Sequence, residues 1–441
     1  MSKQQTCLSL LPAWQAAKVP SEVFCQERCG HNAVCINNEL IIWGGYNNLA
    51  DNGAQYCPTN VLWSFSIELD RWLCVKTSAE LPECSSGACS AILWPYWYLF
   101  CGHNYNGNSN SISRIDLCTL KWECLKVSGK IISPRDKASS WVFLKKIYCF
   151  GGFGPRLDHD FLWCPDEDTF TDDPGVSLPA EAEISRMGWN DQLVYFDTEK
   201  LEWVLVHCQG EKPSSRAAHA TVCINTKVYL FGGRHSTHRL NDLHCLDLES
   251  HTWSGMISCT GNIPEKRSWH SMTHVGKNEI MMYGGFSGFE IPLDDIWMLN
   301  VESFSWTSIK HSTGLPRLWH TASINSLGDI LIFGGCSNNI LDIEANLETS
   351  DKVILIRTEP FSLERLCLHS VYKNKKYTYE GWNLLPKCLQ EWLRLKSAAD
   401  QDKSYAFRSN VLLGLGPSLS DLALLSEEEA EKCKLALRLI V

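Results

Sequence analysis

The chain of 441 residues is 44% hydrophobic and 20% charged, which are ordinary values for a soluble globular protein with a large core. Its formal net charge of −10 argues against nucleic acid as a main partner, because phosphate binding needs a basic face. No continuous apolar stretch approaches the roughly 20 residues that a membrane-spanning helix needs, so no membrane association is expected.

The 21 cysteines include no Cys-x-x-Cys pair, and many of them lie inside apolar runs. We interpret them as small core residues of a protein from a reducing compartment. The spacing of Cys25 and Cys29 has no matching second pair, so neither a metal nor a cofactor is expected. The start, MSKQQTCLSLLPAWQAAK, is a poor signal peptide. The expected location is therefore the cytoplasm, the nucleus or both.

A short apolar run that ends in a glycine pair recurs along the chain. Its copies are IIWGG, IYCFGG, VYLFGG, IMMYGG and ILIFGG, and a sixth copy, YLFCG, keeps one glycine of the pair. A second apolar run follows most copies and ends near a tryptophan, at Trp72, Trp122, Trp203, Trp253 and Trp306. The period of about fifty residues is that of kelch repeats.

Short runs rich in β-branched and aromatic residues are typical of strands, and the glycines permit turns in which a Cβ would clash. Four strands make one blade, and a ring of blades buries the faces that a single blade leaves open. The sequence therefore predicts an all-β, six-bladed kelch β-propeller over residues 24–358. Residues 1–23 form an N-terminal extension, and residues 155–188, rich in Asp, Glu and Pro, form a loop insertion.

In an antiparallel blade, the start of the first strand and the loop after the second strand emerge on the same face, so these segments should line one funnel. The first strands open with Arg-x-x-His, at Arg28 and His31, Arg216 and His219, Arg267 and His270, and Arg317 and His320. A recurring histidine invites a catalytic or metal-binding interpretation. Its repetition favours a structural role instead. The informative positions are those that differ between units.

The residues directly after the glycines are Tyr46, His103, Phe153, Arg234, Phe286 and Cys336. Only the fourth unit places a charge there, and Arg239 adds a second one in the same loop. Two guanidinium groups on a concave, aromatic-lined surface are costly without an anion, and their planar forks suit a carboxylate or phosphate. Ser268 of the next blade is a further hydroxyl donor. The alternative is that both arginines pair with acidic loop residues such as Asp242.

After the propeller, the hydrophobic period changes from two to about 3.6 residues, which predicts helices within residues 359–395. One helical face carries Leu363, Leu366, Cys367, Ser370 and Val371, and a second carries Leu385, Leu389, Trp392 and Leu393, with Pro386 suited to a first turn. Two helices that simply pack against the propeller would show the same amphipathic pattern. Residues 396–441 are expected to be a tail that is partly helical or disordered.

The two helical patterns resemble known docking boxes. Ser-Leu-x-x-x-Cys-x-x-x-Val is similar to the box by which ubiquitin-ligase receptors bind elongin C, which implies that Leu363, Cys367 and Val371 contact that protein. Leu-Pro-x-x-Leu-x-x-x-Leu is similar to the adjoining cullin-2 box, at Leu385, Pro386, Leu389 and Leu393. Each pattern alone is weak, but their order and spacing after a kelch propeller make a strong pair.

From about residue 24 to residue 395, the chain resembles the family of kelch domain-containing proteins 1 and 2. The segments that carry the resemblance are FGGRHSTHRLNDLH, KRSWHS, PRLWHT, SPRDK and MGWND. The family's members are substrate receptors that recognise proteins ending in glycine, among them truncated selenoproteins. The implied partners are elongins B and C, cullin-2, a RING-box protein and such substrates.

The resemblance also implies roles for individual residues. Arg234, Arg239 and Ser268 would clamp the terminal carboxylate of a C-terminal degron, and Tyr46, Lys137, Trp189 and Trp269 would line the rest of the pocket. Phe153 stands where the second family member's pattern has tyrosine, so one hydroxyl contact is missing. The implied function is a non-catalytic adaptor of a cullin-2 ubiquitin ligase.

Two rival functions remain. The first is a kelch scaffold that binds other proteins without a role in ubiquitination. The second is an oxidase of the copper-propeller type, which needs a tyrosine and histidine constellation around a metal on the funnel axis. Histidines that recur with the repeat do not supply one convincingly.

Overall fold

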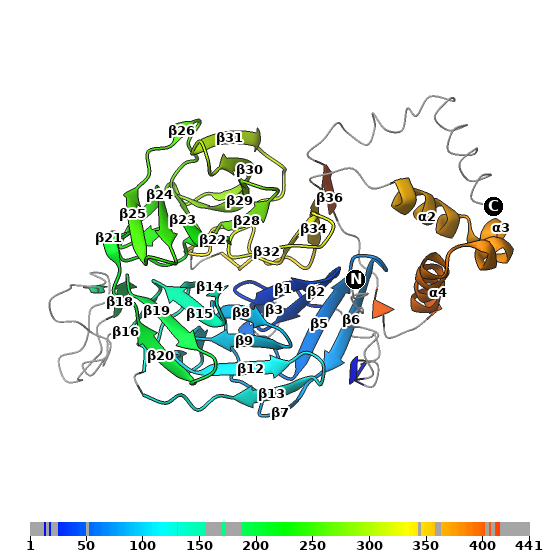
Figure 1. Ribbon diagram of the computed structural model, residues 1–441, viewed down its shortest axis with the longest axis horizontal. Coiled ribbons are helices and arrows are strands. Elements are labelled where there is room, and N and C mark those ends of the chain that lie inside the picture. Colours follow the sequence, from blue (N-terminus) through cyan, green and yellow to red (C-terminus); the bar gives the residue numbers. More distant parts are fainter. Residues whose placement is uncertain are drawn as a thin grey trace.

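The computed structural model describes residues 13–14, 17–18, 25–49, 53–129, 131–155, 170–172, 187–342, 345–357, 363–401, 405–406 and 411–414. These residues form a six-bladed β-propeller followed by a short helical segment, as the sequence predicts (Figure 1). Most of the insertion at 155–188 and of the extension at 1–23 lies outside the described residues. None of the helices among the described residues is long and apolar enough to cross a membrane.

The first three blades are antiparallel sheets whose strands follow one another along the chain. The first blade has β1 (Asn32–Ile36), β2 (Glu39–Trp43), β5 (Val61–Ser66) and β6 (Arg71–Lys76), and the second has β8 (Cys89–Leu93), β9 (Tyr96–Phe100), β12 (Ile112–Asp116) and β13 (Lys121–Cys124). The third has β14 (Ser139–Phe143), β15 (Lys146–Phe150), β19 (Leu193–Asp197) and β20 (Glu202–Leu205).

The second and third strands are longer in the fourth and fifth blades than in the others. They consist of β22 (Ala220–Ile224), β23 (Lys227–His235), β24 (His238–Asp247) and β25 (Thr252–Met256), and of β27 (Arg267–Ser268), β28 (Ser271–Val275), β29 (Glu279–Ser287), β30 (Pro292–Asn300) and β31 (Ser305–Lys310). Short strands extend the outer edges of three blades, namely β7 (Ser78–Ala79), β21 (Gln209–Glu211) and β26 (Thr260–Gly261).

The sixth blade is assembled from two distant parts of the chain. It contains β32 (Thr321–Ile324), β33 (Ile330–Phe333) and β34 (Val353–Arg357), and its fourth strand is β36 (Val411–Gly414), which pairs with β34 in parallel. Residues 405–406 of the same tail form β35 (Tyr405–Ala406) on the outer edge of the first blade. Neither strand was predicted from the sequence.

Between β34 and β35, the chain forms α2 (Leu363–Lys373), α3 (Lys375–Thr378), the 3₁₀ helix η2 (Tyr379–Leu384) and α4 (Lys387–Gln401). These helices lie beside the first and sixth blades (Figure 1).

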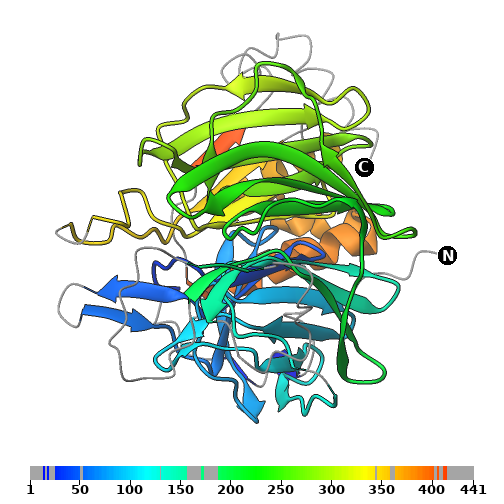
Figure 2. The same cartoon turned by 90° about the vertical axis from the view of Figure 1, so that its left-hand side faces the viewer.

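Loops after the second strands carry hairpins of their own, made by β3 (Tyr46–Leu49) with β4 (Gly53–Tyr56) and by β10 (His103–Asn104) with β11 (Gly107–Asn108). In the third blade, β16 (Phe153–Pro155), β18 (Met187–Asn190) and β17 (Phe170–Asp172) form a small sheet at this place. Figure 2 shows the β3–β4 hairpin, in blue, and the segment near residue 340, in yellow, projecting from the same side of the propeller. These loops build the wall of the funnel face.

The five recurring tryptophans pack one blade onto the preceding one. Each ring contacts the aromatic residue that precedes the glycine pair of the neighbouring blade, at centroid distances of 5.0–5.5 Å: Trp122 with Trp43, Trp203 with Phe100, Trp253 with Phe150, Trp306 with Phe231, and Trp72 with Phe333. The last contact joins the first blade to the sixth and so closes the ring. Trp14 of the N-terminal extension is fully buried in the core formed by the first two blades, and its Nε1 donates to the carbonyl of Leu117 at 2.7 Å.

A closed ring of backbone hydrogen bonds surrounds the propeller axis. In each blade, one residue near the start of the first strand is left-handed, with φ between 54° and 62°: Gly30, Gly87, Lys137, Ala218, Trp269 and Trp319. The N–H of each donates to the carbonyl of the equivalent residue in the preceding blade at 2.8–3.1 Å, and Gly30 donates to Trp319 across the ends of the ring. A left-handed L-residue costs about 1–2 kcal/mol, and here an inter-blade hydrogen bond offsets that cost.

The Arg-x-x-His frame has the structural role that its repetition indicated. Arg28, Arg216 and Arg267 each donate from Nη1 to the carbonyl of the first glycine of their blade's pair at 3.0 Å. The histidine Nε2 atoms of His31, His219 and His320 lie 2.8 Å from a Ser or Thr hydroxyl of the preceding blade. The glycines are required because the next blade approaches so closely: a Cβ on Gly334 would lie 2.4 Å from the carbonyl oxygen of Arg28.

The first prediction concerns a buried ion pair of this frame. Arg267 is fully buried and donates from Nη1 and Nη2 to the two carboxylate oxygens of Asp295 at 2.7 and 2.9 Å. Arg267→Met leaves that carboxylate without its cation, so the free energy of unfolding should fall by about 3–5 kcal/mol in urea titrations. Lys145→Ala, which removes the exposed ion pair with Glu199, is the control and should change little. An Arg267→Met protein as stable as this control would contradict the assignment.

The second prediction concerns acid. Burial, followed by the charge of the adjacent arginine, lowers the pKa of His219 and of His320 to about 3. Because these folded-state pKa values lie below the roughly 6.5 of an unfolded chain, the unfolded chain takes up protons first as the pH falls. The free energy of unfolding should therefore be highest above about pH 6.5 and decline toward pH 3. His219→Gln should weaken the decline in urea midpoints between pH 7 and pH 5, whereas exposed His311→Gln should leave it intact; an equal effect of both would refute this cause.

Candidate functional site

Six equivalent backbone pairings form the mouth of the funnel. In every blade, the residue after the glycine position pairs with a residue of the first-strand frame: Cys29 with Tyr46, Ser86 with His103, Asp136 with Phe153, Ala217 with Arg234, Ser268 with Phe286, and Leu318 with Cys336. The prediction that these two segments lie side by side on one face is confirmed. The side chains that differ between blades therefore face a common space.

The floor of this space is made by three side chains of the axial ring. The indoles of Trp269 and Trp319 have centroids 6.0 Å apart, and the Nζ of Lys137 lies 5.4 Å from the Trp319 ring centroid. Trp319 lies so close to Gly30 that a Cβ there would be 2.8 Å from its Cε2 atom. The absence of a side chain at Gly30 in the first blade thus leaves room for the indole of Trp319 from the sixth blade.

Arg239 of the fourth blade lies beside this floor, whereas the Nε of Arg234 donates to the carbonyl of Ser236 in the hairpin turn at 2.8 Å. Arg234 and Arg239 are cross-strand partners in the β23–β24 hairpin. The Arg239 guanidinium stacks on the Phe286 ring, with Cζ 4.4 Å from the centroid, and its Nε donates to the Ser268 Oγ at 3.2 Å. Ser268 is fully buried, so it orients Arg239 from behind. Trp269 packs against the same Phe286 ring, which brings all three carboxylate-binding candidates and one pocket candidate together.

Arg239 keeps an unused hydrogen-bond donor although it is only 5% exposed, because its Nη2 has no hydrogen-bond partner. The Nε1 of Trp269 is also buried without a partner. Burial lowers the pKa of Arg239, and the charge of Arg234 lowers it further, while Glu290 acts in the opposite direction. Two buried donors without partners, next to a second arginine, suit an anionic, hydrogen-bond-accepting ligand.

Asp242, the alternative partner of the two arginines, is occupied elsewhere. Its carboxylate accepts from Nη1 and Nη2 of Arg216 at 2.7 and 2.8 Å, and the Nε2 of His244 lies 2.9 Å from it. These contacts hold the pKa of Asp242 well below its usual range although burial opposes them. Asp242 therefore serves the Arg-x-x-His frame and does not neutralise Arg234 and Arg239.

A pocket of about 370 Å³ opens on the first, second, third and sixth blades. Two predicted residues, Tyr46 and Lys137, line it, together with residues that the sequence analysis did not place in the site: Tyr56, Ser86, His103, Asp136, Trp319, Asn339, Ile340, Asp342, Ala345 and Leu347. The Tyr56 hydroxyl lies 2.6 Å from the Nδ1 of His103, and Asp136 forms an ion pair with Lys137. The pocket is mixed in character, with aromatic walls and a few charges.

The other two predicted pocket residues lie between these regions. The rings of Phe153 and Trp189 are 5.0 Å apart, and Trp189 is 6.1 Å from His235, the neighbour of Arg234. Trp189 is buried and Phe153 is partly exposed. They form the side wall next to the arginine pair. Trp319 and Phe286 were missed as site residues, although both occupy positions that vary between repeats, and that variation was the available signal.

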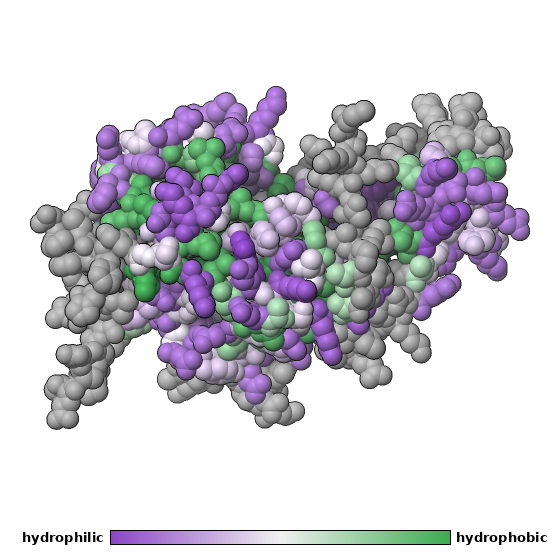
Figure 3. All heavy atoms as spheres, turned by 60° about the horizontal axis from the view of Figure 1, so that its bottom comes forward, coloured by the Kyte–Doolittle hydropathy of each residue, from purple (hydrophilic) through white to green (hydrophobic). Residues whose placement is uncertain are grey.

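The helical segment has a small core of its own. Leu368, Trp382 and Leu393 are buried in it, and Val371, Leu385, Leu389 and Trp392 pack against them. Of the predicted docking residues, Leu393 is therefore internal, Cys367 and Val371 are half-buried, and Pro386 is exposed. Large apolar side chains remain on the surface at Leu366, Tyr377, Tyr379 and Leu384, and the face drawn in Figure 3 shows the helical segment, at the right, as mainly hydrophilic with a few hydrophobic side chains.

The axial channel carries histidines but no metal constellation. A cavity of about 200 Å³ is lined by His31, His219, His270 and His320 among other ring residues. Within the described ranges, no group of three or more His, Cys, Asp or Glu is placed to hold a metal ion. The copper-oxidase alternative therefore gains no support from this channel.

Comparison with known proteins identifies the family. The model of the KLHDC2/KLHL20/DRC7 Kelch-repeats domain matches residues 12–171 and 184–352. Kelch domain-containing protein 2 of Bos taurus is 35% identical over 86% of this chain and 92% of its own length. Kelch domain-containing protein 1 of Homo sapiens is 35% identical over 85% and 92% of the two chains. The chain belongs to this kelch domain-containing protein family.

Membership sets the general function. A more distant relative, kelch domain-containing protein 10 of Xenopus laevis, is 25% identical over 78% of this chain and 79% of its own length. Kelch propellers of this family are protein-interaction modules, and no catalytic family is indicated. The funnel face is where this module carries buried donors without hydrogen-bond partners, at Arg239 and Trp269.

Proposed function

We propose that the protein is the substrate-recognition subunit of a cullin-2 ubiquitin ligase and that its funnel captures the C-terminal carboxylate of proteins ending in glycine. The observation that carries this proposal is the buried, unpartnered Nη2 of Arg239 beside Arg234. Capture of a free C-terminus is an established mode of peptide recognition, and the carboxylate is the group that internal sequences lack.

The geometry favours a carboxylate at the very end of a chain. Arg239 and Trp269 are 5% and 9% exposed, so a ligand atom that reaches both donors must leave water. A terminal glycine suits this depth, because a Cβ on the last residue would add bulk against the Trp269 ring. From there the preceding residues would extend toward the pocket lined by Tyr46, Lys137 and Trp319.

The helical segment supports the ligase part of the proposal. Cys367 and Val371 lie one and two turns after Leu363 on α2, the spacing that the elongin C box requires, and α4 begins directly after Leu385 and Pro386. Because Leu393 is fully buried, its contribution to cullin-2 binding would be to fix the orientation of α4. Ubiquitin would be transferred by another subunit, so the chain itself performs no chemistry.

The third prediction tests the carboxylate clamp. Arg239→Ala should weaken binding of a peptide with a free C-terminal glycine by about 2–5 kcal/mol, because a buried charge pair loses one partner. The same peptide with an amidated C-terminus should bind wild-type protein equally poorly. The measurement is isothermal titration calorimetry, and Arg114→Ala, at an arginine that pairs with Glu123 on the second blade, is the control. Full affinity for the amidated peptide would exclude the clamp.

The fourth prediction tests the ligase role. Leu363→Ala combined with Cys367→Ala should abolish co-purification with elongins B and C, because α2 loses two side chains of the docking pattern. Lys373→Ala, at an exposed position in the last turn of the same helix and outside the docking pattern, should leave co-purification unchanged. If the double variant still retains both elongins, the alternative of a kelch scaffold without a ligase role is favoured.

A further inference from the structure

The junction between the sixth and the first blade differs from the other five junctions. The other junctions join blades that are consecutive in the chain, whereas this one joins blades from its two ends. The two blades share no repeat strand across this junction, because all four repeat strands of the first blade, β1, β2, β5 and β6, come from the first repeat. We name this junction the seam. It is held at the axis by the hydrogen bonds from Gly30 N to Trp319 O and from Gly335 N to Arg28 O.

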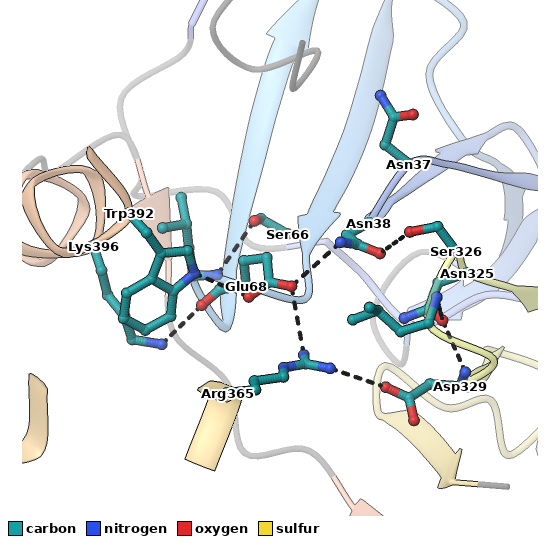
Figure 4. Close-up of polar contacts among 12 residues, drawn as sticks. Asn37, Asn38, Ser66, Glu68, Asn325, Ser326, Asp329, Arg365, Trp392 and Lys396 are labelled. Atoms are coloured by element: carbon teal, nitrogen blue, oxygen red, sulfur yellow. Dashed lines mark hydrogen bonds and ion pairs between the residues drawn. The ribbon is translucent and has the colours of Figure 1, made fainter. Parts of the chain in front are cut away.

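One arginine of the helical segment bridges the seam. Arg365 of α2 extends Nη2 toward Glu68 of the first blade at 3.6 Å and Nη1 toward Asp329 of the sixth blade at 3.5 Å (Figure 4). The side chains of Arg365 and Asp329 are only 12% and 4% exposed, so solvent screens the contact weakly. A single guanidinium thus holds an acid from each side of the seam.

Neighbouring polar groups continue this contact into a closed network. The Nδ2 of Asn38 donates to Glu68 at 3.2 Å, and the hydroxyl of Ser326 in the sixth blade donates to the Oδ1 of Asn38 at 2.9 Å. From α4, the Nε1 of Trp392 and the Nζ of Lys396 donate to the Glu68 side chain and carbonyl, each at 2.9 Å (Figure 4). The helices therefore attach to both blades at once.

The tail repeats the pattern at the outer edge. Residues 405–406 pair with β6 of the first blade, and residues 411–414 pair with β34 of the sixth. The helices at residues 363–401 and the tail strands at residues 405–406 and 411–414 both touch the two blades that flank the seam. The chain has no other described segment that crosses from one of these blades to the other outside the propeller repeats.

The opposite face of the same seam carries the pocket. Tyr46 and Tyr56 come from the first blade, and Trp319, Ile340 and Leu347 come from the sixth. The network lies at the first-to-second and third-to-fourth strand turns, whereas the pocket lies at the second-to-third strand loops, which emerge at the other end of each blade. Any separation of the two blades would therefore pull apart the walls of the pocket.

We infer that residues 363–401, 405–406 and 411–414 act as a clasp that closes the propeller at the seam, and that Arg365 is a positioning residue for the pocket on the opposite face. This goes beyond the proposed function, because the clasp acts on the ring whichever ligand the pocket holds. The seam is where local opening costs least, since no chain connection joins the two blades there. A protein that binds the helices and a peptide that binds the pocket would each favour the closed ring, and so each would raise the other's affinity.

Hydrogen exchange in the full-length chain tests the clasp. In Arg365→Ala, the seam amides of Gly30 and Gly335 should exchange about tenfold faster, while Lys137 and Ala218, which make the equivalent bonds at other junctions, keep their rates. Glu68→Gln, made on the propeller side of the contact, should change the same amides in the same direction. Arg365→Lys, which keeps the charge but cannot reach both acids with a planar fork, should fall between Arg365→Ala and wild type.

Two controls separate the clasp from a general loss of stability and from the proposed function. Arg114→Ala removes an ion pair within the second blade and should leave the seam amides unchanged. Arg365→Ala should also raise the Kd of a peptide ending in a free glycine about fivefold or more, although Arg365 is outside the pocket. If the wild-type protein binds no such peptide, the proposed function is wrong. The exchange rates of the seam amides would still show whether residues of the clasp hold the two blades together. Unchanged seam exchange in both Arg365→Ala and Glu68→Gln, or equal acceleration at Lys137 and Ala218, would overturn it.

Discussion

The closed ring of six hydrogen bonds around the axis is the constraint on which the molecule depends. It requires a left-handed residue in every blade, and it brings each blade so close to the next that the paired glycines become necessary. The same approach buries the arginine and histidine of the four Arg-x-x-His frames, and most of these side chains form hydrogen bonds within the same blade or with the preceding one. The glycines, arginines and histidines that recur in the repeat are therefore residues that suit this close packing of the blades.

The ring also determines which side chains form the floor of the funnel. A left-handed residue directs its side chain toward the axis on the funnel face, and four of the six positions carry a side chain there: Lys137, Ala218, Trp269 and Trp319. The other two are glycines, over one of which Trp319 lies. The backbone has the same hydrogen bonds in all six blades, but the side chains at these positions differ, so the floor of the funnel is asymmetric. The side chains can differ because the hydrogen bonds involve only backbone atoms.

Sequence reasoning succeeded where the repeat is local and failed where distant segments meet. The glycine pairs and tryptophans predicted the six blades, because each blade is encoded in one stretch of about fifty residues. The frame and the post-glycine residues could be placed on one face from strand direction alone. By contrast, nothing in Val411–Gly414 indicates that it completes a blade whose other strands end near residue 357. Trp319 occupies a position that varies between the repeats, but its place over Gly30 depends on contact across the seam.

Arg239 differs from the other buried arginines of the chain in the partners that it has. Arg216 and Arg267 are fully buried, and each is matched by a carboxylate that accepts from two guanidinium nitrogens, besides a glycine carbonyl. Arg239 is buried nearly as deeply, yet it has a serine hydroxyl, an aromatic face and a like charge beside it. Arg28 and Arg135, which are buried without an acid, donate instead to several carbonyl, amide and hydroxyl oxygens. Arg239 has the Ser268 hydroxyl and keeps its Nη2 without a partner on the funnel face. Under the proposed function, a carboxylate at the end of another chain would accept from this donor and neutralise its charge.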